Sequence, residues 1–111
     1  MISVLDVLKQ NEKEAIKILN SKANKGIIFA VWDDDEEVYS NADDCPYIRY
    51  ANDDGEISTQ LVVGVRYNAK KKCIEILTTE DEYKKTDGEW FPINFADDIS
   101  YWCVLEYLEE I

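Results

Sequence analysis

The chain has 111 residues, no histidine, and 24 acidic against 12 basic side chains, which gives a net charge of −12 at pH 7. A hydrophobic fraction of 46% and an aromatic fraction of 12% exclude a disordered chain and predict one folded domain, residues 1–111. Binding to phosphates needs basic clusters, and the only arginines are Arg49 and Arg66, so we expect no direct nucleic-acid partner and no anionic membrane partner.

The N-terminus and the cysteines indicate a cytoplasmic location. The first residues lack the basic n-region of a signal peptide, and Asp6 interrupts their apolar run. No stretch approaches the ~18 apolar residues that span a bilayer. Cys45, Cys73 and Cys103 are odd in number and widely spaced, which is typical of reduced thiols packed as small hydrophobic groups.

The first segment, Val4 to Ala23, has apolar residues on one face at 100° per residue and charged residues on the other, which predicts an amphipathic helix. Ser3 with Asp6 three residues later resembles a capping box, and Gly26 is a stop signal. Asn11 and the residue after it weaken the middle, so two shorter helices remain an alternative.

The middle of the chain predicts a meandering antiparallel sheet. Ile27–Trp32 is a short apolar run typical of a strand buried on both faces. Turn signals at 52–55, 68–72 and 86–88 separate the later strand patterns. Those patterns are Tyr47–Ala51, Glu56–Tyr67, Cys73–Thr78 and Glu89–Ile93.

Helical spacing of apolar residues predicts a last helix over Ile99–Glu110, with Asp97 or Asp98 as its N-cap. The expected fold class is therefore α+β: an N-terminal amphipathic helix, a four- to five-stranded, mainly antiparallel meander sheet and a C-terminal helix, with both helices packed on one sheet face.

The residues Asp98-Ile99-Ser100-Tyr101-Trp102 resemble the acid-x-Thr-His-Trp closing element of some small phage and bacterial domains. Ser100 and Tyr101 stand where those domains have Thr and His, and their Pro-rich tail is missing here. This short resemblance assigns no family.

The residue inventory excludes most enzyme architectures. Without histidine there is no Ser-His-Asp or Cys-His nucleophile, and the four single glycines form no phosphate loop. The acidic run from Asp33 departs from the calcium-binding EF-hand pattern, with Val38 at the sixth position and Asp44 at the twelfth. We expect a non-enzymatic protein with no cofactor and no metal site; paired carboxylates leave a carboxylate-based enzyme as the alternative.

The acidity is concentrated in residues 31 to 60, where ten acids accompany a single arginine, giving −9. Aromatic residues border this segment, and charge around aromatic anchors is typical of protein-binding surfaces. We assign Trp32 to the core and leave Tyr39 and Tyr47 open between core and surface. The candidate partner-binding residues are Asp33, Asp34, Asp35, Glu36, Glu37, Tyr39, Asp43, Asp44, Tyr47, Asp53 and Asp54.

These observations predict an acidic protein-interaction domain that engages a basic protein partner. It would act as an inhibitor or immunity-type protein, or as a nucleic-acid mimic. A small ligand-binding domain, a carboxylate-based enzyme and an accessory domain remain alternatives, and the oligomeric state stays open.

Overall fold

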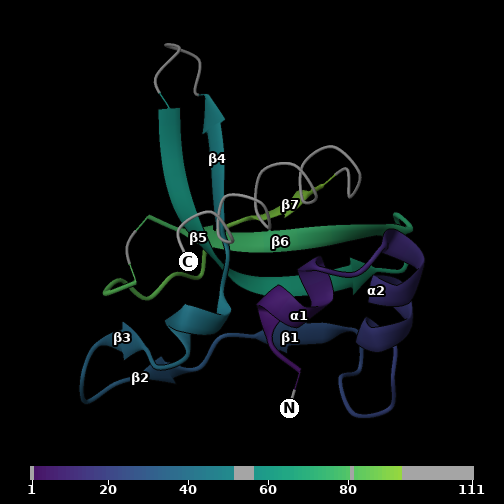
Figure 1. Ribbon diagram of the computed structural model, residues 1–111, viewed down its shortest axis with the longest axis horizontal. Helices are drawn as coiled ribbons and strands as arrows, with labels where there is room; N and C mark the ends of the chain where they lie inside the picture. Colours follow the sequence, from purple (N-terminus) through teal and green to yellow (C-terminus); the bar gives the residue numbers. More distant parts are fainter. Residues whose placement is uncertain (1, 52–56, 81, 94–111) are drawn as a thin grey trace.

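The computed structural model describes residues 2–51, 57–80 and 82–93. It is α+β: two short helices pack on a five-stranded antiparallel sheet, and a small two-stranded hairpin lies beside it (Figure 1). The elements in chain order are α1 (Val4–Leu8), α2 (Glu12–Leu19), β1 (Ile27–Phe29), β2 (Trp32–Asp33), β3 (Val38–Tyr39), the 3₁₀ helix η1 (Ala42–Asp44), β4 (Tyr47–Ala51), β5 (Ile57–Asn68), β6 (Cys73–Thr79) and β7 (Trp90–Pro92).

The N-terminal helical segment is divided in two, so the prediction of one continuous helix over Val4–Ala23 is wrong and its alternative holds. Ser3 and Asp6 form the expected capping box at the start of α1. Asn11 then acts as a second N-cap, because its side chain accepts a hydrogen bond from the N–H of Glu14 (2.9 Å). A side chain that caps a new helix gives its backbone a non-helical conformation, and this ends the first helix.

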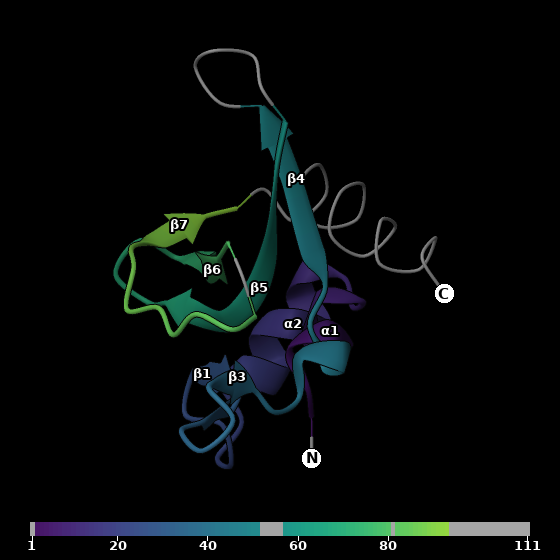
Figure 2. The same cartoon turned by 90° about the vertical axis from the view of Figure 1, so that its left-hand side faces the viewer.

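The antiparallel sheet is built around β5, which has 12 residues and lies at its centre. One edge of β5 pairs with β6, and β7 follows on β6. The other edge pairs first with β4, where Tyr47 faces Leu61, and then with β1, where Ile28 faces Val65. Strand β1, which follows the two helices in the chain, therefore joins the same sheet as the later strands β4 to β7 (Figures 1 and 2).

Strand β1 departs from the expected strand over Ile27–Trp32, which was to be buried on both faces. It ends at Phe29, and Trp32 belongs to the separate hairpin. Ile28 joins the core beneath the helices, whereas the Phe29 side chain is 52% exposed on the other face. Since α1 and α2 cover only one face of the sheet, successive residues of this strand cannot all be buried.

The second face of the sheet carries a row of side chains from four strands. Gly64 on β5 lies beneath Phe29 and Trp90, whose rings meet edge to face at 5.7 Å. A Cβ at Gly64 would lie 2.9 Å from Cη2 of Trp90, so the bare backbone makes this ring contact feasible. Arg66 lies over the Trp90 ring, and its Nε donates to Glu75 at 2.8 Å.

Two other expectations lie outside the described residues: the turn over 52–55 and the last helix over Ile99–Glu110 with its caps. The packing of that helix on the sheet is therefore not described either. Among the helices of the described ranges, none is long and apolar enough to cross a membrane.

Candidate functional site

The acidic run Asp33–Glu37 forms the turn of the β2–β3 hairpin. Trp32 and Tyr39 face each other across the two strands, and their rings contact edge to face at 5.0 Å. The Asp33 carboxylate accepts the N–H groups of Asp35 (2.9 Å) and Glu36 (3.3 Å), which fixes the turn. The side chains from Asp34 to Glu37 are exposed. Asp33 is half-buried, and its carboxylate is hydrogen-bonded to the backbone of the turn.

Tyr39 attaches this hairpin to the rest of the protein. Its ring is only 7% exposed and belongs to the core. Its N–H donates to the carbonyl of Glu82, and its hydroxyl accepts from the N–H of Thr86, both at 3.1 Å. Of the two interpretations left open for Tyr39, the structure therefore shows the core position, and the ring offers a partner no exposed anchor. Trp32 also packs against the core, as expected.

The next two carboxylates are positioned by η1. Asn41 accepts the N–H of Val31 at 2.7 Å, and the N–H of Ser40 donates to the carbonyl of Val31 at 2.8 Å. These bonds fold the chain back after the hairpin and leave Asp43 and Asp44 exposed beside it. Tyr47 is partly buried at the start of β4 and packs against the core.

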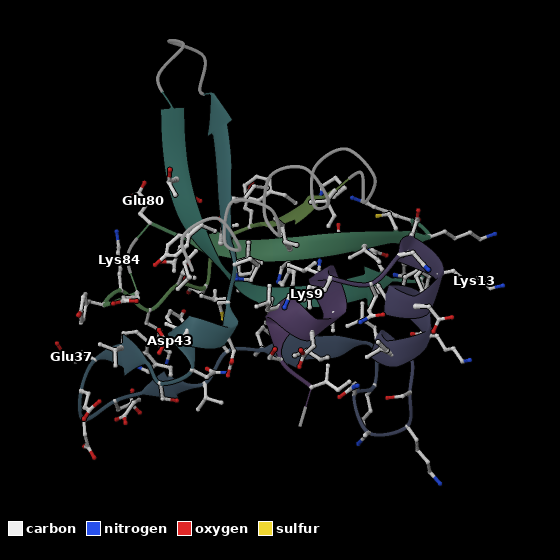
Figure 3. The ribbon with its side chains drawn as sticks, viewed as in Figure 1. Lys9, Lys13, Glu37, Asp43, Glu80 and Lys84 are labelled. Atoms are coloured by element: carbon white, nitrogen blue, oxygen red, sulfur yellow. The ribbon has the colours of Figure 1, made fainter. Side chains whose placement is uncertain are left out.

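A shallow groove of about 400 Å³ joins three segments of the chain. Glu36 from the hairpin turn, Asp43 from η1 and Glu82 from the segment after β6 line it together. Tyr83 borders the same groove and is 64% exposed. In Figure 3, Glu37, Asp43 and Glu80 lie at this end of the molecule together with Lys84, whereas Lys13 lies at the opposite end and Lys9 near the middle.

The sequence interpretation missed Glu82 and Tyr83. The sequence contained a signal for these two residues: the acidic run Glu80–Glu82 is followed by Tyr83, which repeats the pattern of an acidic run next to an aromatic residue. Asp53 and Asp54, which were also candidates, lie outside the described residues. We use the name acidic surface for the exposed or groove-lining carboxylates Asp34, Asp35, Glu36, Glu37, Asp43, Asp44 and Glu82.

The carboxylates of this surface accept hydrogen bonds and carry negative charge. Burial, together with the negative charge of Asp44, raises the pKa of Cys45 to about 12, so this thiol stays protonated at neutral pH and is no nucleophile. In the part of the chain that the structure describes, no three His, Cys, Asp or Glu side chains gather as a metal site would require.

No protein-family model, curated protein or solved structure matches this chain.

Proposed function

We propose that this protein is a non-enzymatic interaction domain whose acidic surface binds a basic protein partner, as an inhibitor or immunity-type protein or as a nucleic-acid mimic. One observation carries the proposal: Glu36 of the hairpin, Asp43 of η1 and Glu82 of the segment after β6 line one groove, and their neighbours in the chain include further exposed carboxylates. A basic enzyme, or a protein with a nucleic-acid cleft, is the kind of partner that such a surface attracts.

The local structure supports binding because it fixes the backbone that carries the carboxylates before the partner arrives. The Trp32–Tyr39 pair and the bonds from Tyr39 to Glu82 and Thr86 attach the hairpin to the core. A fixed backbone has less freedom to lose on association, so a larger share of the attraction remains as affinity. The net charge of −12 adds a long-range field that speeds encounter with a cationic protein.

The groove between Glu36, Asp43 and Glu82 is the feature that the alternative, a small ligand-binding domain or a carboxylate-based enzyme, would use. Acid–base catalysis by carboxylates usually relies on one group in an apolar, buried site, where its pKa rises. Here Glu36 and Asp43 are exposed and Glu82 is half-buried, an arrangement better suited to contact with another surface than to catalysis. An accessory domain without this activity is the remaining alternative.

The test compares two variants that change the net charge equally. Glu36→Gln with Glu37→Gln alters the acidic surface, whereas Glu12→Gln with Glu14→Gln alters exposed carboxylates in the first turn of α2. Each immobilised protein is exposed to a lysate of the organism that encodes it, at low and at high salt, and the retained proteins are quantified by mass spectrometry.

We expect one basic protein to be retained at low salt by the wild type and by the α2 variant. Its retention by the hairpin variant should fall at least tenfold, and the difference should shrink at high salt because exposed charges are screened. Equal retention by both variants, or a partner without excess positive charge, would remove the support for the acidic surface.

A further inference from the structure

The outer edge of β1 is the feature that the acidic surface leaves unexplained. In the described residues, β1 is the terminal strand of the order β1-β5-β6-β7, so its second edge pairs with no strand there. An open edge offers backbone N–H and C=O groups to another extended chain.

The pairing with β5 determines which backbone groups face outward. The carbonyl of Gly26 accepts from the N–H of Tyr67, and the N–H of Ala30 donates to the carbonyl of Val63. Residues alternate along an antiparallel strand, so Phe29 directs its N–H and C=O away from β5. The neighbouring outward N–H groups already have partners: the N–H of Ile27 donates to the carbonyl of Asn24, and the N–H of Val31 to the side chain of Asn41.

An apolar groove follows this edge. It has a volume of about 350 Å³, and its apolar lining includes Ile2, Phe29 and Val31, whose side chains are 39%, 52% and 56% exposed. These are three of the five large hydrophobic residues that are most exposed among those described. Exposed apolar side chains beside an open strand edge provide what strand addition needs: a backbone partner and a site for an alternate side chain.

The charges at the two ends of the groove indicate which kind of segment it would bind. Asp44 is the only charged residue in the groove lining, where it lies with Val31 and Asn41, and the acidic hairpin follows from Val31 along the chain. At the other end, the groove is bordered by Ala23 and Asn24, which lie between Lys22 and Lys25 in the sequence. An occupant with a cation at the Asp44 end therefore gains attraction, whereas one with an acid there is repelled.

We propose that the edge of β1 binds an extended segment of the basic partner, with its backbone paired to Phe29, an apolar side chain in the groove, and a Lys or Arg beside Asp44. This inference rests on the proposed function, because it names the segment through which the basic partner is held. The acidic surface attracts the partner from a distance, and the β1 edge supplies the short-range contact.

The experiment uses a display library of randomised ten-residue peptides, selected on the full-length protein at physiological salt. The enriched peptides should alternate apolar and other residues and carry Lys or Arg at one end. Bound peptide should slow hydrogen exchange of the Phe29 amide at least tenfold. Selections that give no binder, binders without cations, or binders that leave the Phe29 amide unprotected would each overturn the inference.

Two pairs of variants locate the contact. Phe29→Pro removes the outward N–H without removing a bond to β5, and Phe29→Ala retains that N–H, so the loss of affinity should be at least tenfold greater for the proline. If Phe29→Pro fails to fold, the second pair decides: Val31→Lys should weaken the peptides at least tenfold and Val31→Thr less than about threefold. Equal effects within the deciding pair would contradict strand addition.

The same variants separate this inference from the proposed function. A lysate partner that needs Glu36 and Glu37 but tolerates Val31→Lys leaves the proposed function standing and refutes the β1 site. A partner that is lost with Val31→Lys but retained without the two glutamates supports the β1 site and refutes the acidic surface. Loss with both variants supports both, and loss with neither refutes both.

Discussion

Glu75 is a buried charged residue in the middle of the sheet, with a relative exposure of 2%. Burial alone would raise the pKa of its carboxyl group, but hydrogen bonds from Arg66 (2.8 Å) and Asn68 (3.2 Å), with the positive charges of Arg66 and Lys71, hold the pKa below its ordinary value of 4.5. Arg66 also covers Trp90, with its guanidinium carbon 4.4 Å from the ring centroid. Arg66 therefore connects β5, β6 and β7 through one ion pair and one cation–π contact, on the face that α1 and α2 do not cover.

We expect Glu75→Gln to lower the free energy of unfolding by about 1–3 kcal/mol at neutral pH, because Arg66 then lacks its charged partner. A carboxyl group whose pKa is depressed by folding stabilises the protein above its ordinary pKa, 4.5, and this contribution is lost as the pH falls through the folded pKa. The difference between wild type and variant, measured by urea titration, should therefore shrink as the pH is lowered below 4.5.

Glu89→Gln is the control for this prediction, because Glu89 is exposed. It should change the free energy of unfolding by less than about 0.5 kcal/mol, both at neutral pH and below pH 4.5. A difference for Glu75→Gln that stays constant with pH would mean that the Glu75 charge contributes nothing to folding.

At the scale of elements, the β2–β3 hairpin combines a structural base with an exposed tip. Trp32 and Tyr39 form the base, and the Asp33 carboxylate closes the turn through two backbone N–H groups. Within the described part of the chain, the carboxylates of the next four residues take part in no hydrogen bond of the hairpin. The charge of the tip is therefore separable from the fold of the hairpin.

We expect the quadruple variant Asp34→Asn, Asp35→Asn, Glu36→Gln, Glu37→Gln to fold and to be slightly more stable, because it relieves repulsion among exposed like charges. Each replacement should contribute only a few tenths of a kcal/mol. Asp33→Ala, which removes the turn-closing acceptor, should instead cost about 1 kcal/mol. Urea titration tests both, and a loss of several kcal/mol in the quadruple variant would show that these side chains are structural.

At the scale of the whole molecule, acidic side chains outnumber basic ones two to one. Glu37 and Asp43 lie on the hairpin and η1 at one end of the molecule, where Lys84 lies as well, and Lys13 lies on α2 at the other end (Figure 3). The field of the protein is therefore negative overall, and under the proposed function we expect it to attract a basic partner.

The cysteines give a prediction for the whole fold. Cys45 is buried and Cys73 half-buried, and both are free thiols. We expect Cys103 to be reduced as well, and thermal unfolding to be the same with and without strong reductant. A decrease in melting temperature of about ten degrees or more in reductant would indicate a disulfide, and it would contradict the predicted cytoplasmic location.

The sequence by itself determined those features of the fold that depend on residues close to one another in the chain. The period of apolar residues predicted the strands β4, β5 and β6 and an antiparallel α+β fold, and the capping pair Ser3 and Asp6 marked the first helix. These features follow from the conformation of a few consecutive residues, and a local pattern is sufficient to indicate them. Helix capping by Asn11 was locally encoded too, but its competition with helix continuation is decided by small energy differences.

Only the tertiary structure decided which distant residues meet. Glu82 comes beside Glu36 and Asp43 because Tyr39 pairs its backbone with that segment, a contact that joins positions 43 residues apart in sequence. Tyr39 is buried and Phe29 exposed for a similar reason, since each position depends on what the rest of the chain packs against it. An apolar residue in a strand has the same local pattern whether or not a helix covers it, so burial is determined by the whole fold.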